Sequence, residues 1–304
     1  MSISWNGVYP ALLTPFDSSD QLDLPLFAKN LQEQVEAGVN GIILGGSLGE
    51  ASVLTTTEKE KLVKFAVEKL KGKIPVVLNI AEGSTQEALQ QAAYAKTWGA
   101  TGLMLLPPMR YKSDDRETVS YFKTVADSTD LPVMIYNNPI DYKIEVTLDM
   151  FQELTACKNI TAVKESTRDV TNVTRMINRF GNRFKILCGV DTLAMEELCL
   201  GADGWVAGLV DAFPRETVAI YKLVKAGRIA DATKIYRWFM PLLELDIKPK
   251  LVQYIKLAAE KTGIGSEHVR APRLAIVGKE REEVLKIINE GITSRPVLPD
   301  YLNL

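Results

Sequence analysis

Lys164 is the residue of this chain best suited to covalent chemistry. It follows the apolar run 160–163, so we expect it at the end of a buried strand. Burial disfavours the charged form of lysine, which lowers its pKa and leaves a free amine able to add to a carbonyl carbon. A lysine that pairs with Glu165 or another carboxylate fits the same position equally well, and the spacing does not separate the two interpretations.

Tyr136 ends the apolar run 133–135, one predicted strand before Lys164. Where neighbouring strand ends meet, its hydroxyl would approach the Lys164 amine and relay protons while an imine forms. The alternative interpretation is an aromatic plug that closes the core.

A glycine-rich turn, Gly45-Gly46-Ser47-Leu48-Gly49, follows the apolar run 41–44. Its backbone N–H groups and the Ser47 hydroxyl are suited to hold an anion, although such turns also serve as plain connectors. The turn lacks the Gly-Lys-Ser/Thr ending of a P-loop, so we expect no nucleotide here.

These groups need a scaffold that brings strand ends together. Short apolar runs without polar–apolar alternation, typical of strands buried on both faces of a parallel sheet, alternate with helix-like segments. Eight such units predict an α/β fold, a (β/α)₈ TIM barrel. An open doubly wound sheet is the alternative, but no Gly-x-Gly-x-x-Gly follows the first strand. The predicted strands are 8–13, 41–44, 75–80, 102–106, 132–136, 160–163, 185–188 and 204–206, and the predicted helices are 24–37, 56–70, 85–98, 115–127, 147–154, 170–180, 193–200 and 215–226.

Beyond Gly227 the strand pattern ceases, and 228–245, 251–263 and 280–290 have the pattern of helices. We therefore expect a barrel over residues 1–226 and a C-terminal three-helix extension, 227–304, packed on it. Because functional groups of such barrels lie at the C-terminal strand ends, this fold selects Lys164, Tyr136 and the glycine-rich turn. It also selects the loops that contain Arg110, Tyr111, Asn138 and Gly208.

Composition excludes several classes of protein. The 36 basic and 38 acidic residues give a formal charge of −2, which argues against nucleic acid as a partner. A hydrophobic content of 46% excludes a disordered chain. His268 is the only histidine and there are 3 cysteines, so we expect no metal centre. Neither a signal peptide nor an apolar run of membrane-spanning length is visible, and we expect a cytoplasmic protein with no membrane partner.

Taken in chain order, four motifs resemble those of a known family. Gly46-Ser47-Leu48-Gly49-Glu50, Tyr136-Asn137-Asn138-Pro139, Val163-Lys164-Glu165-Ser166 and Gly189-Val190-Asp191 look like the dihydrodipicolinate synthase / N-acetylneuraminate lyase family. The resemblance implies a TIM barrel with a helical C-terminal extension, assembled as a homotetramer or homodimer. It also implies class I lyase chemistry, in which Lys164 forms a Schiff base with the keto carbon of a small 2-oxo acid, often pyruvate.

The resemblance implies further roles in the site. Tyr136 would be the proton relay, Gly208 would line the pocket, and Asn138 would belong to its substrate-binding wall. The substrate carboxylate would be bound by Gly46, Ser47 and Leu48. Arg110, with Tyr111 next to it, stands where the family has a loop tyrosine. No metal or organic cofactor is implied, because the protonated imine is itself the electron sink.

Two departures bear on the specific reaction. Family synthases carry a threonine at the position of Leu48, and those that make dihydrodipicolinate carry an arginine at the position of Asp141, where an acid would repel the second substrate's carboxylate. The Tyr-Asn-Asn-Pro motif, with Pro-Met-Arg-Tyr-Lys upstream and residues 252–257 downstream, is similar to that of catabolic members, one of which is 1-pyrroline-4-hydroxy-2-carboxylate deaminase. The alternatives are 4-hydroxy-tetrahydrodipicolinate synthase, a 2-keto-3-deoxy sugar acid dehydratase or aldolase, N-acetylneuraminate lyase and, in another class, a non-catalytic 2-oxo acid sensor.

Overall fold

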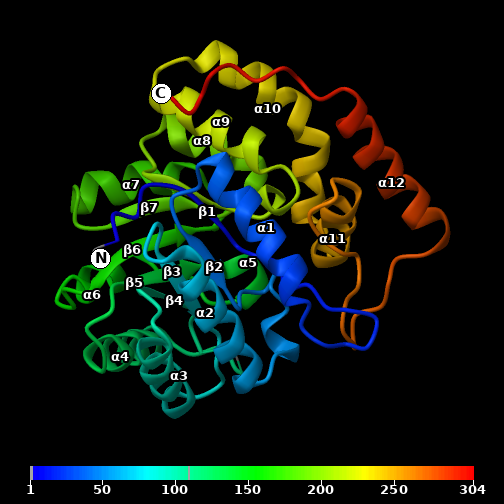
Figure 1. The fold of residues 1–304 in the computed structure, drawn as a ribbon. Helices are drawn as coiled ribbons and strands as arrows, with labels where there is room; N and C mark the ends of the chain where they lie inside the picture. The colour runs from blue at the N-terminus through cyan, green and yellow to red at the C-terminus, as the bar shows by residue number, and fades with distance from the viewer. Residues whose placement is uncertain (1–2, 109) are drawn as a thin grey trace.

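The computed structural model describes residues 3–108 and 110–304. Its centre is an eight-stranded parallel sheet in the order β1-β8-β7-β6-β5-β4-β3-β2 (Figure 1). The two ends of this order meet, because Ala11 bridges Ile43 and the Leu12 amide donates to the Ile43 carbonyl at 3.0 Å. The predicted (β/α)₈ TIM barrel is therefore confirmed. The strands are β1 (Gly7–Pro10), β2 (Ile42–Leu44), β3 (Val76–Ile80), β4 (Gly102–Leu105), β5 (Val133–Asn137), β6 (Ile160–Glu165), β7 (Lys185–Cys188) and β8 (Gly204–Ala207).

Helices alternate with the strands and surround the barrel (Figure 1). Local signals set their ends: Thr55 and Glu58 form a reciprocal capping box at the start of α2, and Gly38 ends α1 in the left-handed conformation. The predicted helices are found with small shifts at their ends. They are α1 (Leu24–Ala37), α2 (Thr56–Leu70), α3 (Thr85–Trp98), α4 (Asp115–Asp127), α6 (Leu148–Leu154), α7 (Thr171–Phe180), α8 (Ala194–Cys199) and α9 (Pro214–Lys225).

Two differences from the predicted elements affect the site. β6 continues to Glu165 instead of ending at residue 163, so Lys164 is part of the strand. A short helix, α5 (Pro139–Tyr142), follows β5 and is absent from the prediction. The Asn138 side chain caps it by accepting from the Asp141 amide at 3.2 Å, and Pro139 occupies its first turn. Four residues are too few to show a helical period in the sequence.

The C-terminal segment forms three long helices, as predicted: α10 (Ile229–Leu243), α11 (Leu251–Lys261) and α12 (Gly278–Thr293). They contact one another on one side of the barrel, yellow to red in Figure 1, and α10 packs on α9. A one-turn 3₁₀ helix, η4 (Glu244–Ile247), connects α10 to α11. The boundary of the extension at residue 226 stays a prediction. Within the described part of the chain, no helix has the length and apolarity needed to cross a bilayer.

A buried ion pair ties this extension to the barrel. Lys256, on α11, is fully buried and pairs with the equally buried Glu50, which directly follows the glycine-rich turn. Lys256 also donates to the His268 carbonyl at 2.5 Å, and Glu50 accepts from the Arg270 amide at 3.2 Å. Glu50 has φ = 56°, a left-handed conformation that is uncommon for a residue with a side chain. These contacts hold Glu50 in that conformation and so define where the glycine-rich turn ends.

We predict that Lys256→Met lowers the free energy of unfolding by roughly 3–5 kcal/mol, because it leaves the Glu50 carboxylate buried without its main partner. Chemical denaturation of the purified variant measures this loss. Lys261→Met is the matched control, since Lys261 lies on the same helix, is partly exposed and pairs only with Glu260 at the surface; we expect a change within about 0.5 kcal/mol. Equal stability of the two variants would refute the proposed role of the pair.

Candidate active site

Lys164 projects into the mouth of the barrel from β6. Its backbone is in register with Tyr136 on β5, so the two side chains leave neighbouring strands at the same level. Adjacent residues of a strand point to opposite faces, and Glu165 accordingly faces the helix layer. There its carboxylate accepts from the Thr167 amide and from Asn172 Nδ2, both at 2.7 Å. The pairing of Lys164 with Glu165, one of the two interpretations left open by the sequence, is not what the structure shows.

The Lys164 amine lies in a desolvated pocket. The residue is 7% exposed, and its Nζ lies 4.1 Å from the centroid of the Tyr136 ring. Burial lowers the pKa of Lys164, while Tyr142, Asp246 and Asp191 act in the opposite direction without cancelling that effect. A larger fraction of the amine is therefore free at neutral pH than in an exposed lysine.

Asp191, the acid of the Gly189-Val190-Asp191 motif, is hydrogen-bonded to groups of the barrel. Its carboxylate accepts from Trp205 Nε1 at 2.9 Å and from the amides of Gly208 and Leu209 at 3.1 and 2.7 Å. Gly189 leaves the space that Lys164 needs, because a Cβ there would lie 2.6 Å from Lys164 Cε. The loop after β7 therefore shapes the cavity around the lysine side chain.

Tyr136 and Tyr142 form the aromatic side of the pocket. Their rings meet edge to face with centroids 5.5 Å apart. The Tyr136 hydroxyl accepts from Asn138 Nδ2 at 3.1 Å, and the Tyr142 hydroxyl shares a 2.6 Å hydrogen bond with Ser47 Oγ. Burial raises the pKa of Tyr136 to about 12, so its phenol is protonated at neutral pH. Tyr142 and Ser47 thus place two hydroxyl groups next to each other, whereas Leu48, the residue after Ser47, has no hydroxyl.

The glycine-rich turn forms an adjoining side of the pocket, since its Ser47 is bonded to Tyr142. Gly46 and the buried Leu48 line it, and the space in front of Gly46 is open. Gly49 must be a glycine, since a Cβ there would lie 2.8 Å from the Leu12 carbonyl oxygen. Thr14 Oγ1 donates to the Gly49 carbonyl at 2.7 Å and holds the turn against β1. The turn is therefore a firmly supported wall with an open backbone, suited to a small anionic group.

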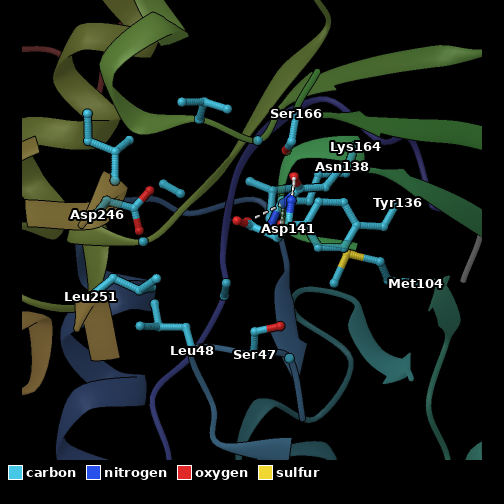
Figure 2. A pocket seen from close by; sticks show the side chains of 18 of the residues that line it. Ser47, Leu48, Met104, Tyr136, Asn138, Asp141, Lys164, Ser166, Asp246 and Leu251 are labelled. Atoms are coloured by element: carbon cyan, nitrogen blue, oxygen red, sulfur yellow. Dashed lines mark hydrogen bonds between the residues drawn. The ribbon is translucent and has the colours of Figure 1, made fainter. Parts of the chain in front are cut away.

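Two acidic and two basic side chains line this pocket. The basic ones are Lys164 and the exposed Arg168; the acidic ones are Asp141, on α5, and Asp246, on η4. Asp141 Oδ2 accepts from Asn138 Nδ2 at 2.7 Å, which orients the carboxylate beside Tyr136 (Figure 2). An additional carboxylate on a substrate would therefore meet the Asp141 carboxylate beside Tyr136.

The structure brings together most residues predicted for the site. One pocket is lined by Lys164, Tyr136, Gly46, Ser47, Leu48, Gly208 and Asn138 (Figure 2). Arg110 is not among its lining residues: it lines a neighbouring cavity that shares Ser47 with this pocket, with its side chain packed against Gly83. Tyr111 is 55% exposed and is not part of the pocket lining.

Several pocket residues have no predicted role in the sequence analysis. Tyr142 stands three residues after the Tyr-Asn-Asn-Pro motif, and only the turn of α5 returns it to the pocket. Asp246, Ile247 and Leu251 come from the extension, where the helical pattern gives no sign of a site. His268 lies elsewhere, with Nε2 2.7 Å from Asp20 Oδ1. Across residues 3–108 and 110–304, no cluster of three or more His, Cys, Asp or Glu side chains is arranged to hold a metal ion.

The sequence and the fold are both similar to those of known enzymes. Residues 4–291 match the model of the Dihydrodipicolinate synthetase family. The chain is 31% identical to 4-hydroxy-tetrahydrodipicolinate synthase of Exiguobacterium sibiricum, over 90% of this chain and 92% of that protein. It is also 31% identical to the synthase of Aquifex aeolicus, over 94% and 98%. The solved structure of the synthase from Methylacidiphilum fumariolicum SolV superposes with a TM-score of 0.91 at 25% identity, over 95% of this chain and 96% of the other.

We predict that pyruvate plus borohydride adds a covalent mass at Lys164, because reduction traps a lysine imine. Lys164→Ala and Lys164→Arg should both abolish the adduct, since alanine lacks the nitrogen and a guanidinium does not condense with a ketone. Because burial lowers the pKa of Lys164, the rate of imine formation should rise with pH and level off below 10.5, the ordinary lysine value. Intact-mass measurement and peptide mapping at several pH values test both statements.

Lys185→Arg is the control for this experiment. Lys185 also lies on a barrel strand, but its Nζ is held by Asp203 Oδ1 at 2.7 Å, and we expect the adduct to form as in the unmodified protein. An adduct that persists in Lys164→Ala would remove Lys164 as the nucleophile.

Proposed function

This chain belongs to the dihydrodipicolinate synthetase family, a family of lysine-imine lyases, and we propose that its substrate is a small cyclic imino acid that condenses with Lys164. The specific activity we propose is that of 1-pyrroline-4-hydroxy-2-carboxylate deaminase. The similar proteins named above are 4-hydroxy-tetrahydrodipicolinate synthases, and that activity is the alternative against which the proposal is tested.

The charge of the pocket wall carries the proposal. Asp141 lines the cavity beside Tyr136, held there by Asn138, so a second carboxylate would be repelled at this part of the wall. A substrate with a single carboxylate, a ring nitrogen next to the carbon that bears it and an uncharged hydroxyl farther along the ring matches this wall. The ring nitrogen of a pyrroline becomes a basic amine once Lys164 adds to the ring, and acidic neighbours then stabilise its protonated form.

The pocket offers a place for the single carboxylate. The open backbone at Gly46 and Leu48 and the Ser47 hydroxyl support its binding, with the C2 carbon directed toward Lys164 Nζ. The hydrogen bond between Ser47 and Tyr142 orients that hydroxyl. Tyr136, whose ring lies against the amine, is the proposed proton relay.

The proposed reaction balances without an oxidant or reductant. The Lys164 nitrogen adds to C2, the ring nitrogen takes a proton, and the bond between C2 and the ring nitrogen breaks, leaving C2 in an imine with Lys164. This imine acidifies C3, so a proton leaves C3 and the hydroxyl leaves C4 as water. Proton shifts then move the new double bond to C5 and its nitrogen, and two waters hydrolyse the imines at C5 and C2. Overall, the pyrroline and one water give 2-oxoglutarate semialdehyde and ammonia.

The assembly stays a prediction. The resemblance implies a homotetramer or homodimer, and the family is typically oligomeric. One similar solved structure, with a TM-score of 0.89 and 25% identity, is described as a monomeric dihydrodipicolinate synthase variant. This fold therefore does not in itself require a second subunit.

We predict that the purified protein converts 1-pyrroline-4-hydroxy-2-carboxylate to 2-oxoglutarate semialdehyde and ammonia, followed by NMR and by an ammonia assay. Parallel reactions contain 2-keto-3-deoxy sugar acids, N-acetylneuraminate, or pyruvate with aspartate semialdehyde. We expect the pyrroline to be turned over at least about a hundredfold faster than each of these, because differences in charge complementarity of a few kcal/mol correspond to such ratios.

Three results would contradict this assignment. Pyruvate release from a sugar acid without turnover of the pyrroline would indicate an aldolase or dehydratase. Condensation of pyruvate with aspartate semialdehyde would indicate the synthase, despite Asp141. Imine trapping without turnover of any substrate would indicate a 2-oxo acid sensor.

A further inference from the structure

Asp246 reaches the active-site pocket from outside the barrel. It lies on η4, the single turn between α10 and α11, and Figure 2 shows its carboxylate directed into the pocket that contains Lys164. Ile247 and Leu251 of the same segment complete this wall. The extension thus supplies an ionisable group as well as apolar cover.

The barrel is shaped to receive this carboxylate. A Cβ on Gly208, at the end of β8, would lie 2.5 Å from Asp246 Oδ1, so only glycine leaves room for the acid. η4 also packs against η2 (Asp191–Leu193), the 3₁₀ turn that follows β7. Gly208 is therefore more than a pocket-lining residue, because it sets how closely Asp246 approaches the cavity.

The charged and titratable groups around Asp246 come from each element near it. They are Asp191 on η2, Lys164 on β6, Tyr136 on β5, Asp141 on α5 and Asp211 after β8. Burial and the neighbouring Asp191 carboxylate raise the pKa of Asp246, and Lys164 acts in the opposite direction. Asp246 therefore retains its proton to a higher pH than an exposed aspartic acid does.

We propose that Asp246 is the acid that protonates the departing C4 hydroxyl of the substrate. This inference rests on the proposed function and deepens it. As a solvent water accepts the proton from C3, the electron pair of the C3–H bond forms the C3–C4 double bond and the C4–O bond breaks. The oxygen takes the Asp246 proton and leaves as water, and the Asp246 carboxylate is reprotonated from solvent before the next turnover.

The other polar groups of the pocket fit this step less well. The oxygens of the Asp191 carboxylate already accept hydrogen bonds from Trp205, Gly208 and Leu209. Asp141 is held by Asn138 at the exposed rim. Tyr136 has a pKa of about 12, which makes it a much weaker acid than a carboxyl group. Asp246 combines access to the cavity with a transferable proton.

The test compares Asp246→Asn with Glu244→Gln, a matched control on the exposed part of the same turn. We expect kcat for the hydroxylated pyrroline to fall at least about a hundredfold in Asp246→Asn and to stay within about twofold in Glu244→Gln, since general acid catalysis contributes a factor of about 10²–10⁴. The alkaline limb of the kcat/KM profile that reports Asp246 should disappear. Formate should restore part of the rate to Asp246→Ala, which a purely structural role would not allow.

A second substrate separates this step from imine formation. 1-Pyrroline-2-carboxylate lacks the hydroxyl, so borohydride trapping with it should be equal, within about twofold, in Asp246→Asn and the unmodified protein. Loss of this trapping would place Asp246 before hydroxyl departure and overturn the inference. Turnover of the hydroxylated pyrroline by Asp246→Asn at nearly the unmodified rate would overturn it while leaving the proposed function intact. An unmodified protein inert toward the hydroxylated pyrroline would overturn both.

Discussion

Desolvation of one lysine amine is the constraint around which this molecule is arranged. Lys164 lies one residue before the end of a strand buried on both faces, and removal of water from its amine favours the uncharged form. The Tyr136 ring and the acids near the amine lower the free-energy cost of burying the lysine. Asp191, the most buried of these, accepts its hydrogen bonds from backbone and indole N–H groups and not from the lysine. The amine is thus held near carboxylates and still available to an electrophile.

The C-terminal extension is an integral part of the site. Through Lys256 it holds Glu50, and with it the end of the glycine-rich turn. Through η4 it brings Asp246 to the opposite wall of the cavity. Both walls of the pocket therefore depend on contacts between the barrel and the extension, which explains why charged residues are buried at that interface despite their desolvation cost.

Membership of the family defines the lysine-imine chemistry, while the pocket wall bears on the substrate. The synthases to which the chain is similar share about a third of its residues, so the shared barrel does not determine what lies opposite the lysine. Here α5 and η4 bring Asp141 and Asp246 into the pocket lining, and Tyr142 supplies a hydroxyl that is hydrogen-bonded to Ser47. We infer that substrate choice in this protein resides in these two short connections.

The sequence by itself determined the barrel, its alternating helices and the position of Lys164 and Tyr136, because buried parallel strands, glycine stops and N-caps are local patterns. It also placed Gly46, Ser47, Leu48, Asn138 and Gly208 at strand ends, and all of them line the pocket.

The sequence left open whether Lys164 pairs with Glu165. The alternation of side chains along β6 answers this question only once the register of the strand is known, and it places the two side chains on opposite faces. Arg110 and Tyr111, which the sequence also selected, lie outside the pocket lining, Arg110 in a neighbouring cavity that shares Ser47 and Tyr111 at the exposed surface. Only the tertiary structure brought in Tyr142 and Asp246, since a four-residue helix and an inter-helix turn carry no periodic signal and their side chains meet the site through contacts distant in sequence.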